Sequence, residues 1–455
     1  MVRGNINKDL EAMHSKHGLV LRIGPEEVTF AHPDAWNDIF RPTGRQPFNK
    51  DPTWWKNLPG TPISIITAVD PEDSAYIRKC LAPAFSSRAF RLQEPIFNHY
   101  ASLLISRLRE TVESGQDEVD IFRWFNFYTF DTYGDLAFGE SFQCLERGTF
   151  HEWVARLFQF GKLLGAIGIV RLYPNLTAVL MKLIPRSLIK AQDGHNQLIM
   201  DKVQRRLERG FERPDLMSEI AVQGFSNLKN ESGKGLPVEV LASSLAFLAV
   251  AGSEPLAVTL GGAMNYLLHN PDKLAMLQHE IRQRFKSGDQ ITVETTRELT
   301  YLTAVLDEAL RLCPGVRWIP PRRVPKGGAV ICGRWLPGGT SVSFSNSAMN
   351  REPSSWHDSN GFHPERWLPE AATDPKSPFY ADKRHAAQPF MLLAPTSCMG
   401  HQIAWAEMRL GLARFLWTFD VALPEKEKWV RWEDLRTFML IEKKPIMVRL
   451  KVRAT

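Results

Sequence analysis

Residues 388–409 read QPFMLLAPTSCMGHQIAWAEMR, and this stretch governs the interpretation of the whole chain. It places one cysteine, Cys398, in a loop directly before a run with helical periodicity that starts at Gly400. The free N–H groups and the dipole of a helix N-terminus stabilise a thiolate, and a thiolate facing an apolar pocket suits a haem iron. Most single cysteines are instead buried structural residues. On its own, the stretch leaves both alternatives open.

The cysteines are scattered and odd in number: Cys80, Cys144, Cys313, Cys332 and Cys398. No Cys-x-x-Cys pair occurs, which argues against a disulfide framework and against structural zinc. The pattern favours a reducing, intracellular compartment. A cysteine hydrolase is poorly supported, because His401 lies near Cys398 but no orienting partner is evident.

The chain has 455 residues, of which 44% are hydrophobic, and a net charge of +6. This is enough apolar material for a large core. There is no dense run of Lys and Arg, so nucleic acid is not an expected partner. The mild basic excess fits a solvated surface, or docking to an acidic protein or a membrane. Residues 1–17 are polar and resemble neither a signal peptide nor a membrane anchor.

Helical periodicity dominates the sequence. The predicted helices are residues 95–113, 121–142, 151–170, 187–209, 238–268, 271–285, 302–313 and 400–417. Strand-like runs are fewer and shorter: residues 19–23, 28–31, 328–335, 340–344 and 446–452. Pro and Gly cluster at 314–328 and 336–339, which predicts loops and hairpins. We expect a single compact unit that is mainly α with a small β-rich part, an α+β arrangement.

The apolar run at residues 241–268 is long enough to span a bilayer. It carries Glu254 near its centre, with Pro255 next to it. A charge at that depth in a membrane costs about 2.5–3.5 kcal/mol or more. A buried central helix of a large helical protein explains the run better.

Glu308 and Arg311 lie on one face of a predicted helix and can pair. The ordinary explanation is a surface ion pair, which contributes little. Further along the chain, residues 362–367 read FHPERW in a Pro-rich loop region, and Arg366 there would complete a buried Glu–Arg–Arg network. Glu-x-x-Arg alone is a weak signal, but the two segments together are a strong one.

With these motifs in this order and spacing, the chain resembles the cytochromes P-450. Residues 251–254 (AGSE) look like the family's oxygen-activating helix. Residues 135–140 (DLAFGE) and 327–333 (GGAVICG) look like members from fungal secondary metabolism. The resemblance runs from about Leu19 to Lys444. It implies the cytochrome P-450 fold, with a polar segment without membrane anchor at 1–18 and a haem domain at 19–455.

The resemblance also implies roles for individual residues. Cys398 would ligate the iron of haem b through its thiolate. Arg78 and Arg322 match arginines that bind the haem propionates, a task that suits the permanent charge and forked donors of arginine. Glu254 matches the acid of the family's acid–alcohol pair, and a carboxylate in so apolar a helix is the candidate catalytic residue.

The cysteine loop departs from the family pattern. Phe390 lies one residue further from the cysteine than usual, and Ala394 and Thr396 stand where the family has glycine and arginine. Ser74 stands where a histidine is common before Arg78. The chain therefore lacks two expected partners of the haem propionates, and we expect weaker haem retention than is usual in the family.

The acid–alcohol pair is also altered, because Pro255 follows Glu254 where the family has threonine. Proline has no hydroxyl to relay a proton, has no N–H, and kinks a helix interior. This loss favours a haem-thiolate isomerase, cyclase or dehydratase without net oxygen insertion as an alternative function. Ala394 and Thr396 motivate a second alternative, a degenerate non-catalytic paralogue.

The leading interpretation is a monooxygenase that oxidises a hydrophobic small molecule in secondary-metabolite biosynthesis, with electrons from NADPH through a reductase. Apolar segments suited to such a substrate are residues 54–66, the helix around Phe247 and Ala251, 316–320 and 438–439. The expected location is the cytoplasm or the cytoplasmic face of the endoplasmic reticulum, where peripheral contact with the membrane is an option.

Overall fold

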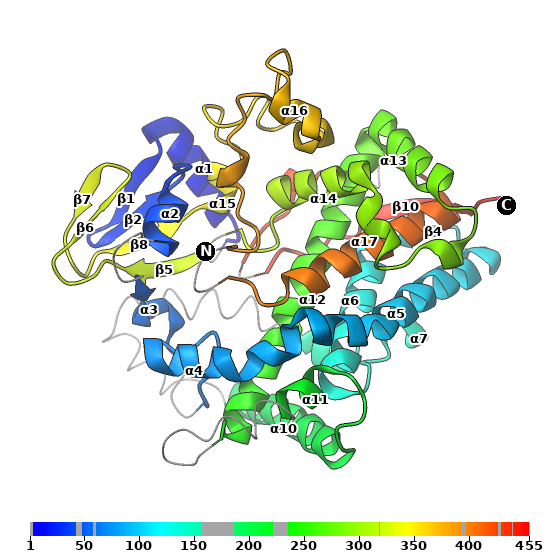
Figure 1. The fold of residues 1–455 in the computed structure, drawn as a ribbon, viewed down its shortest axis with the longest axis horizontal. Helices are drawn as coiled ribbons and strands as arrows, with labels where there is room; N and C mark the ends of the chain where they lie inside the picture. The colour runs from blue at the N-terminus through cyan, green and yellow to red at the C-terminus, as the bar shows by residue number, and fades with distance from the viewer. Residues whose placement is uncertain are drawn as a thin grey trace.

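Helices make up most of the protein in this computed structural model, and the strands gather mainly on one side (Figure 1). The structure describes residues 3–41, 48–57, 61–156, 158, 186–221, 235–317, 319–392, 397–425, 429–438 and 440–454. The larger of two apolar clusters lies among the helices, and the smaller one lies against a five-stranded sheet. The predicted fold class, mainly α with a small β-rich part, is confirmed.

α12 (Val238–His269) runs through the middle of the helical part in Figure 1. It packs against α6 (Ile121–Phe138), α10 (Arg186–Glu208), α14 (Thr300–Leu312) and α17 (His401–Thr418). Within the part of the chain that the structure describes, α12 is the one helix long and apolar enough to cross a membrane. Its packing against these helices confirms the expected buried central helix.

Two helices differ from their predicted ends. α5 (Ser87–Glu113) begins before residue 95, because Ser86 is its N-cap and accepts a hydrogen bond from the backbone N–H of Ala89. Pro95 therefore lies inside α5 rather than at its start. α6 ends at Phe138 rather than at residue 142, because Gly139 adopts a φ of +66° and terminates the helix.

The remaining long helices occur within one or two residues of their predicted ends: α10, α12, α13 (Pro271–Arg284), α14 and α17. In the predicted helix 151–170, residues 152–156 and 158 are helical, and 157 and 159–170 lie outside the described residues. Among the described residues, the other α-helices are α1 (Ile6–His17), α2 (Ala35–Phe40), α3 (Pro52–Trp55), α4 (Pro71–Leu81), α7 (Cys144–Arg147), α11 (Leu216–Ile220), α15 (Asn346–Met349) and α16 (Pro369–Thr373).

The main sheet has the strand order β1 (Val20–Gly24), β2 (Glu27–Phe30), β8 (Ser341–Phe344), β5 (Ile319–Arg323) and β3 (Asn49–Lys50). β2 and β8 are parallel, and the other neighbours are antiparallel. A second sheet has the order β4 (Glu118–Asp120), β10 (Met447–Val452) and β9 (Phe419–Ala422). The predicted strands at 19–23, 28–31, 340–344 and 446–452 are thus confirmed.

Two predictions for the β-rich part are wrong. Residues 328–335 form not one strand but a hairpin of β6 (Ala329–Ile331) and β7 (Arg334–Leu336), because Cys332 and Gly333 between them have positive φ values of 48° and 74°. The Pro- and Gly-rich residues 314–328 predict a loop, yet they contain β5. The register of β5 is irregular between Ile319 and Arg322, which is how a strand accommodates prolines.

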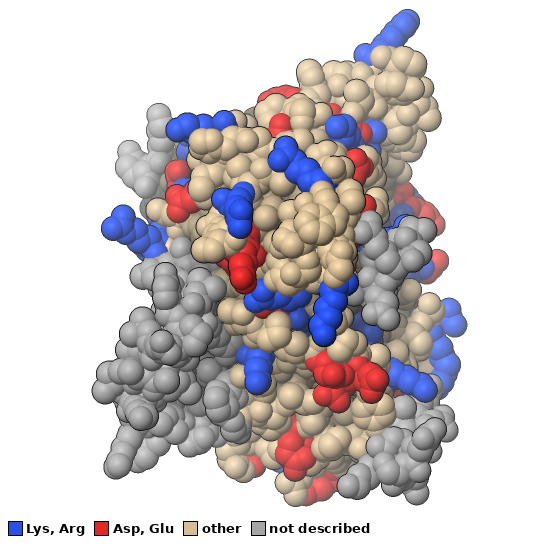
Figure 2. Space-filling view, turned by 90° about the vertical axis from the view of Figure 1, so that its left-hand side faces the viewer, with Lys and Arg blue, Asp and Glu red and all other residues tan. Residues whose placement is uncertain are grey.

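The face on the β-rich side carries both signs of charge (Figure 2). Among the described residues on this face, lysines and arginines are dispersed among acidic side chains and form no continuous basic stripe. The β6–β7 hairpin also carries exposed apolar side chains, Trp335 at 63% and Val330 at 46%. The described residues of this face therefore present no array of cations of the kind that binds a phosphate backbone.

Candidate active site

Cys398 lies in the loop before α17, and Gly400 is the N-cap of that helix. The backbone N–H of Cys398 donates to the Phe390 carbonyl at 2.8 Å, which closes the cysteine loop. Although Cys398 as a whole residue is exposed, the protein around its sulfur raises the pKa of the thiol by desolvation, while the Gly400 backbone N–H and the Arg78 guanidinium oppose this shift. A metal ion on the sulfur would outweigh the effect of burial, because a coordinating thiol is deprotonated.

Arg78 reaches the cysteine loop from α4. Its Nη2 donates to the Ser397 carbonyl at 2.6 Å and to Ser397 Oγ at 3.2 Å. The first turn of α4 is fixed by Asp70, whose carboxylate accepts two backbone hydrogen bonds there. The structure therefore brings together Arg78 and Cys398, two residues that the sequence assigned to one site.

Glu308 is the centre of a buried ionic network. Arg311 donates to its two oxygens at 2.7 and 2.9 Å, and Nε of Arg366 donates to Oε1 at 3.0 Å. The backbone N–H of His363 and the indole N–H of Trp367 donate to the same carboxylate at 2.9 Å. Burial alone would raise the pKa of Glu308, but the arginines outweigh it and hold the pKa below its usual value. The predicted network is thus present.

Glu254 on α12 is only 1% exposed. Its Oε2 pairs with Nζ of Lys443 at 2.6 Å, and its Oε1 has no hydrogen-bond partner among the described residues. The Lys443 ammonium lies 4.3 Å from the ring centroid of Phe122 and 5.0 Å from that of Phe158. Burial raises the pKa of Glu254 and lowers that of Lys443, and their attraction reduces both shifts. No local pattern around Glu254 in the sequence indicates Lys443 as its partner.

Pro255 lies on a more open face of α12 than Glu254, a face it shares with Phe247 and Ala251. The helix continues through Pro255, and Oγ1 of Thr259 donates to the Pro255 carbonyl at 2.9 Å. The loop after α14 passes directly against this proline. A Cβ on Gly315 would lie 2.4 Å from Cβ of Pro255, so only glycine fits at that position.

Arg322 on β5 is almost completely buried, with 6% exposed. Its Nε has no hydrogen-bond partner, and no Asp or Glu pairs with it, among the described residues. The guanidinium carbon lies 5.5 Å from the ring centroid of Phe40 and 5.7 Å from that of Trp55. Burial lowers the pKa of Arg322 to about 10. A buried cation in such surroundings is suited to an anionic partner.

Two of the expected pocket segments are joined by hydrogen bonds. The backbone N–H of Ile65 donates to Oγ of Ser244 on α12 at 3.1 Å, and Oγ of Ser243 donates to the Pro62 carbonyl at 3.2 Å. Residues 61–66 therefore lie against the N-terminal half of α12. Several predicted positions lie outside the described residues: 58–60, Trp318, Ala394, Thr396 and Met439.

Comparison with known proteins decides the family, because the sequence profile described as Cytochrome P450 matches residues 1–449. The chain belongs to the cytochrome P450 family. Relatives include the cytochrome P450 monooxygenases astJ of Aspergillus oryzae (36% identical, 99% of this chain, 88% of the relative) and atr2 of Stereocaulon alpinum (38%, 99%, 87%). Another is the trichothecene C-15 hydroxylase of Fusarium sporotrichioides (36%, 99%, 89%).

The haem domain of cytochrome P450DA matches this cytochrome P450 with a TM-score of 0.77 at 20% identity, over 98% of this chain and 92% of that chain. The fold predicted from the motifs is therefore confirmed. The chain is an oxidoreductase of the P450 monooxygenase type, and its cofactor is haem b ligated by cysteine.

The residues present fit this cofactor. Of the five cysteines in the chain, Cys398 alone is an exposed residue, while Cys80, Cys144 and Cys313 are buried and Cys332 is half-buried. Haem b carries two carboxylates, and Arg322 is a buried cation without a described carboxylate partner. A sulfur that is free to bind iron and a cation that suits a propionate are the donors that an iron porphyrin requires.

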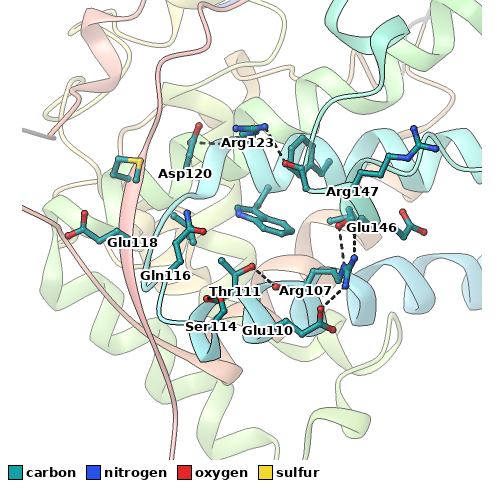
Figure 3. Close-up of a pocket in the computed structure, with 16 residues that line it drawn as sticks. Arg107, Glu110, Thr111, Ser114, Gln116, Glu118, Asp120, Arg123, Glu146 and Arg147 are labelled. Atoms are coloured by element: carbon teal, nitrogen blue, oxygen red, sulfur yellow. Dashed lines mark hydrogen bonds and ion pairs between the residues drawn. The ribbon is translucent and has the colours of Figure 1, made fainter.

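Figure 3 shows a different pocket of about 580 Å³, between α5, α6, α7 and β4. Charged side chains line it, and several pair locally, as Arg107 does with Glu110 at 2.6 Å. The predicted site residues Cys398, Arg78, Arg322 and Glu254 do not line this pocket. It is therefore not the haem site of this cytochrome P450.

Proposed function

We propose that this cytochrome P450 oxidises a hydrophobic small molecule in fungal secondary-metabolite biosynthesis, with Cys398 as the axial ligand of the haem iron. One observation carries the assignment: Cys398 is an exposed residue in a loop ahead of α17, with Arg78 bonded to the preceding residue. The relatives support the pathway class, since they are fungal P450 monooxygenases and one is a trichothecene hydroxylase. Electrons come from NADPH through a reductase.

The haem supplies the oxygen chemistry when it is bound. Arg78 and Arg322 hold its carboxylates, because each presents a permanent positive charge beside or within the site. The open face of α12 at Phe247 and Ala251, together with residues 61–66, orients an apolar substrate and excludes water.

Glu254 is the residue that we propose as the proton carrier. Burial raises its pKa, so the carboxyl group holds a proton more readily than an ordinary glutamate does. The ammonium of Lys443 fixes one carboxylate oxygen, which leaves Oε1 as the atom available to exchange a proton. Lys443 is thus a positioning residue for Glu254.

The carbon-monoxide difference spectrum of the reduced protein tests the assignment of Cys398. We expect Cys398→Ser to lose the band of a thiolate-ligated haem. Cys332→Ser, which changes a half-buried cysteine in the β6–β7 turn, should keep it. A thiolate band that persists in Cys398→Ser would refute the ligand assignment, and a parent protein without any haem band would favour the degenerate paralogue.

A haem-thiolate isomerase, cyclase or dehydratase is the second candidate, and Pro255 is the observation that favours it. Pro255 has no hydroxyl, so the alcohol of the family's acid–alcohol pair is missing from α12. We compare NADPH use, peroxide release and product for the parent and Pro255→Thr. A monooxygenase should become better coupled with the threonine, by up to the roughly 10²-fold that proton transfer typically contributes. Turnover by the parent without NADPH and oxygen would establish the second candidate.

A further inference from the structure

Lys50 and Arg322 form a pair of buried cations in the main sheet. They are direct neighbours on the antiparallel strands β3 and β5. Lys50 is 7% exposed and Arg322 is 6% exposed. Both contact one indole, since Nζ of Lys50 lies 5.4 Å and Cζ of Arg322 lies 5.7 Å from the ring centroid of Trp55. Two like charges therefore lie close together away from bulk water.

No acidic side chain among the described residues balances this pair. The nearest along the chain, Asp51, instead pairs with Nε of Arg323 at 3.0 Å and accepts a hydrogen bond from Ser341. Burial and, second, the charge of Arg322 lower the pKa of Lys50 to about 7. Two like charges in a buried cluster are unfavourable, so an anion bound there would stabilise both.

The Lys50 ammonium has donor capacity left for such an anion. Nζ donates to the carbonyls of Ile65 and Ile66, at 2.9 Å each. An ammonium has three protons, so one remains free. The Lys50 ammonium thus shares the Trp55 ring with Arg322 and also binds the backbone of residues 65 and 66. This segment lies against α12, because the backbone N–H of Ile65 donates to Ser244.

We propose that Lys50 is a haem-carboxylate ligand that acts jointly with Arg322 and makes up for the arginine that Thr396 replaces. The inference rests on the proposed function only in taking haem as the source of the anion. The proposal also gives Lys50 a second effect. The same ammonium that binds the haem carboxylate donates hydrogen bonds to Ile65 and Ile66, and so fixes residues 61–66. Neither effect follows from the family motifs found in this sequence, because Lys50 lies outside all of them.

The transfer of haem from the holoprotein to an acceptor apomyoglobin measures retention. We expect Lys50→Met to lose haem roughly tenfold faster than the parent, as the loss of a charge-assisted hydrogen bond implies. Lys50→Arg should stay close to the parent. Lys56→Met is the matched control, because Lys56 is an exposed lysine that directly follows α3. Equal rates for Lys50→Met and Lys56→Met would overturn the proposal.

Two further measurements distinguish haem binding by Lys50 from a purely structural role. Ser244→Ala loosens residues 61–66 from the α12 side and removes no cation, so it should not accelerate haem loss as Lys50→Met does. The resonance Raman bands of the haem carboxylate groups should shift in both Lys50 variants and not in Ser244→Ala. Unchanged carboxylate bands in Lys50→Arg would overturn the proposal even if Lys50→Met yields no holoprotein. The thiolate band stays in all variants, so failure here is distinct from failure of the Cys398 assignment.

Discussion

Glu308 and Glu254 are both buried carboxylates on helices that pack together, α14 and α12, but their surroundings differ. Glu308 receives hydrogen bonds from two arginines, a backbone N–H and an indole, and its pKa is held low. Glu254 has one cation, and one of its oxygens has no described partner, so burial dominates and its pKa is raised. The number of donors therefore separates a permanently charged structural group from one that can exchange a proton.

Removal of the charge at Glu308 should have the largest effect. Glu308→Gln leaves Arg311 buried without a carboxylate and leaves Arg366 with Asp382 as its remaining acidic partner. A broken buried pair costs about 3–5 kcal/mol. We expect a large drop in the free energy of unfolding in urea, with little folded holoprotein. Glu365→Gln is the control, since Glu365 is a half-buried partner of Lys273 at 2.7 Å. That change should cost about 1 kcal/mol or less, and equal losses in the two variants would contradict the contrast.

Gly315→Ala tests the crowded region next to Glu254. The new Cβ would lie 2.4 Å from Cβ of Pro255, so α12 or the loop after α14 must move. Overpacking of this kind costs about 1–3 kcal/mol, and thermal unfolding of the holoprotein should show it. Gly288→Ala is the control, because a Cβ there meets nothing closer than 3.4 Å. If Gly315→Ala were as stable as this control, the backbone around Pro255 would have to move at no cost in free energy.

Lys443→Met should make stability fall more strongly with rising pH than it does in the parent. Without the ammonium, burial raises the pKa of Glu254 further, so the folded state holds a proton that the unfolded state has released. The free energy of unfolding should then fall as pH rises above the ordinary glutamate value, by at most about 1.4 kcal/mol per pH unit. Urea unfolding at a series of pH values measures the slope.

The controls for this pH dependence are Lys444→Met and a double variant. Lys444 is the exposed neighbour of Lys443, and its replacement should leave the parent profile unchanged. The addition of Glu254→Gln to Lys443→Met should abolish the new slope, because the titrating group is gone. A slope that persists in the double variant would show that another group is responsible.

The sequence predicted what is local or carried by a motif. The apolar run of α12 and the spacing of Glu308 from Arg311 are local patterns, and both were confirmed. The start of α5 was missed because Pro95 resembles a first helical residue, whereas the cap is Ser86. Partners brought together only by tertiary packing, such as Lys443 for Glu254, have no local signal. The roles of Cys398, Arg78, Arg322 and Glu254 at the haem stay predictions until the spectra above are measured.

Thr396→Arg should have the smallest effect of these changes. It tests whether a further cation next to the cysteine loop improves the retention of haem. The family resemblance places an arginine at this position, and the added charge should slow the loss of haem to an acceptor protein. The gain is limited, because Arg78 already bonds to the adjacent Ser397 and would repel a second guanidinium. We therefore expect a gain of about 1 kcal/mol or less, which corresponds to roughly fivefold slower loss. Thr396→Gln adds similar bulk without charge and should resemble the parent. If the arginine gave no gain, Lys50 and Arg322 would already saturate the haem carboxylates, and in Lys50→Met the same arginine should then restore retention.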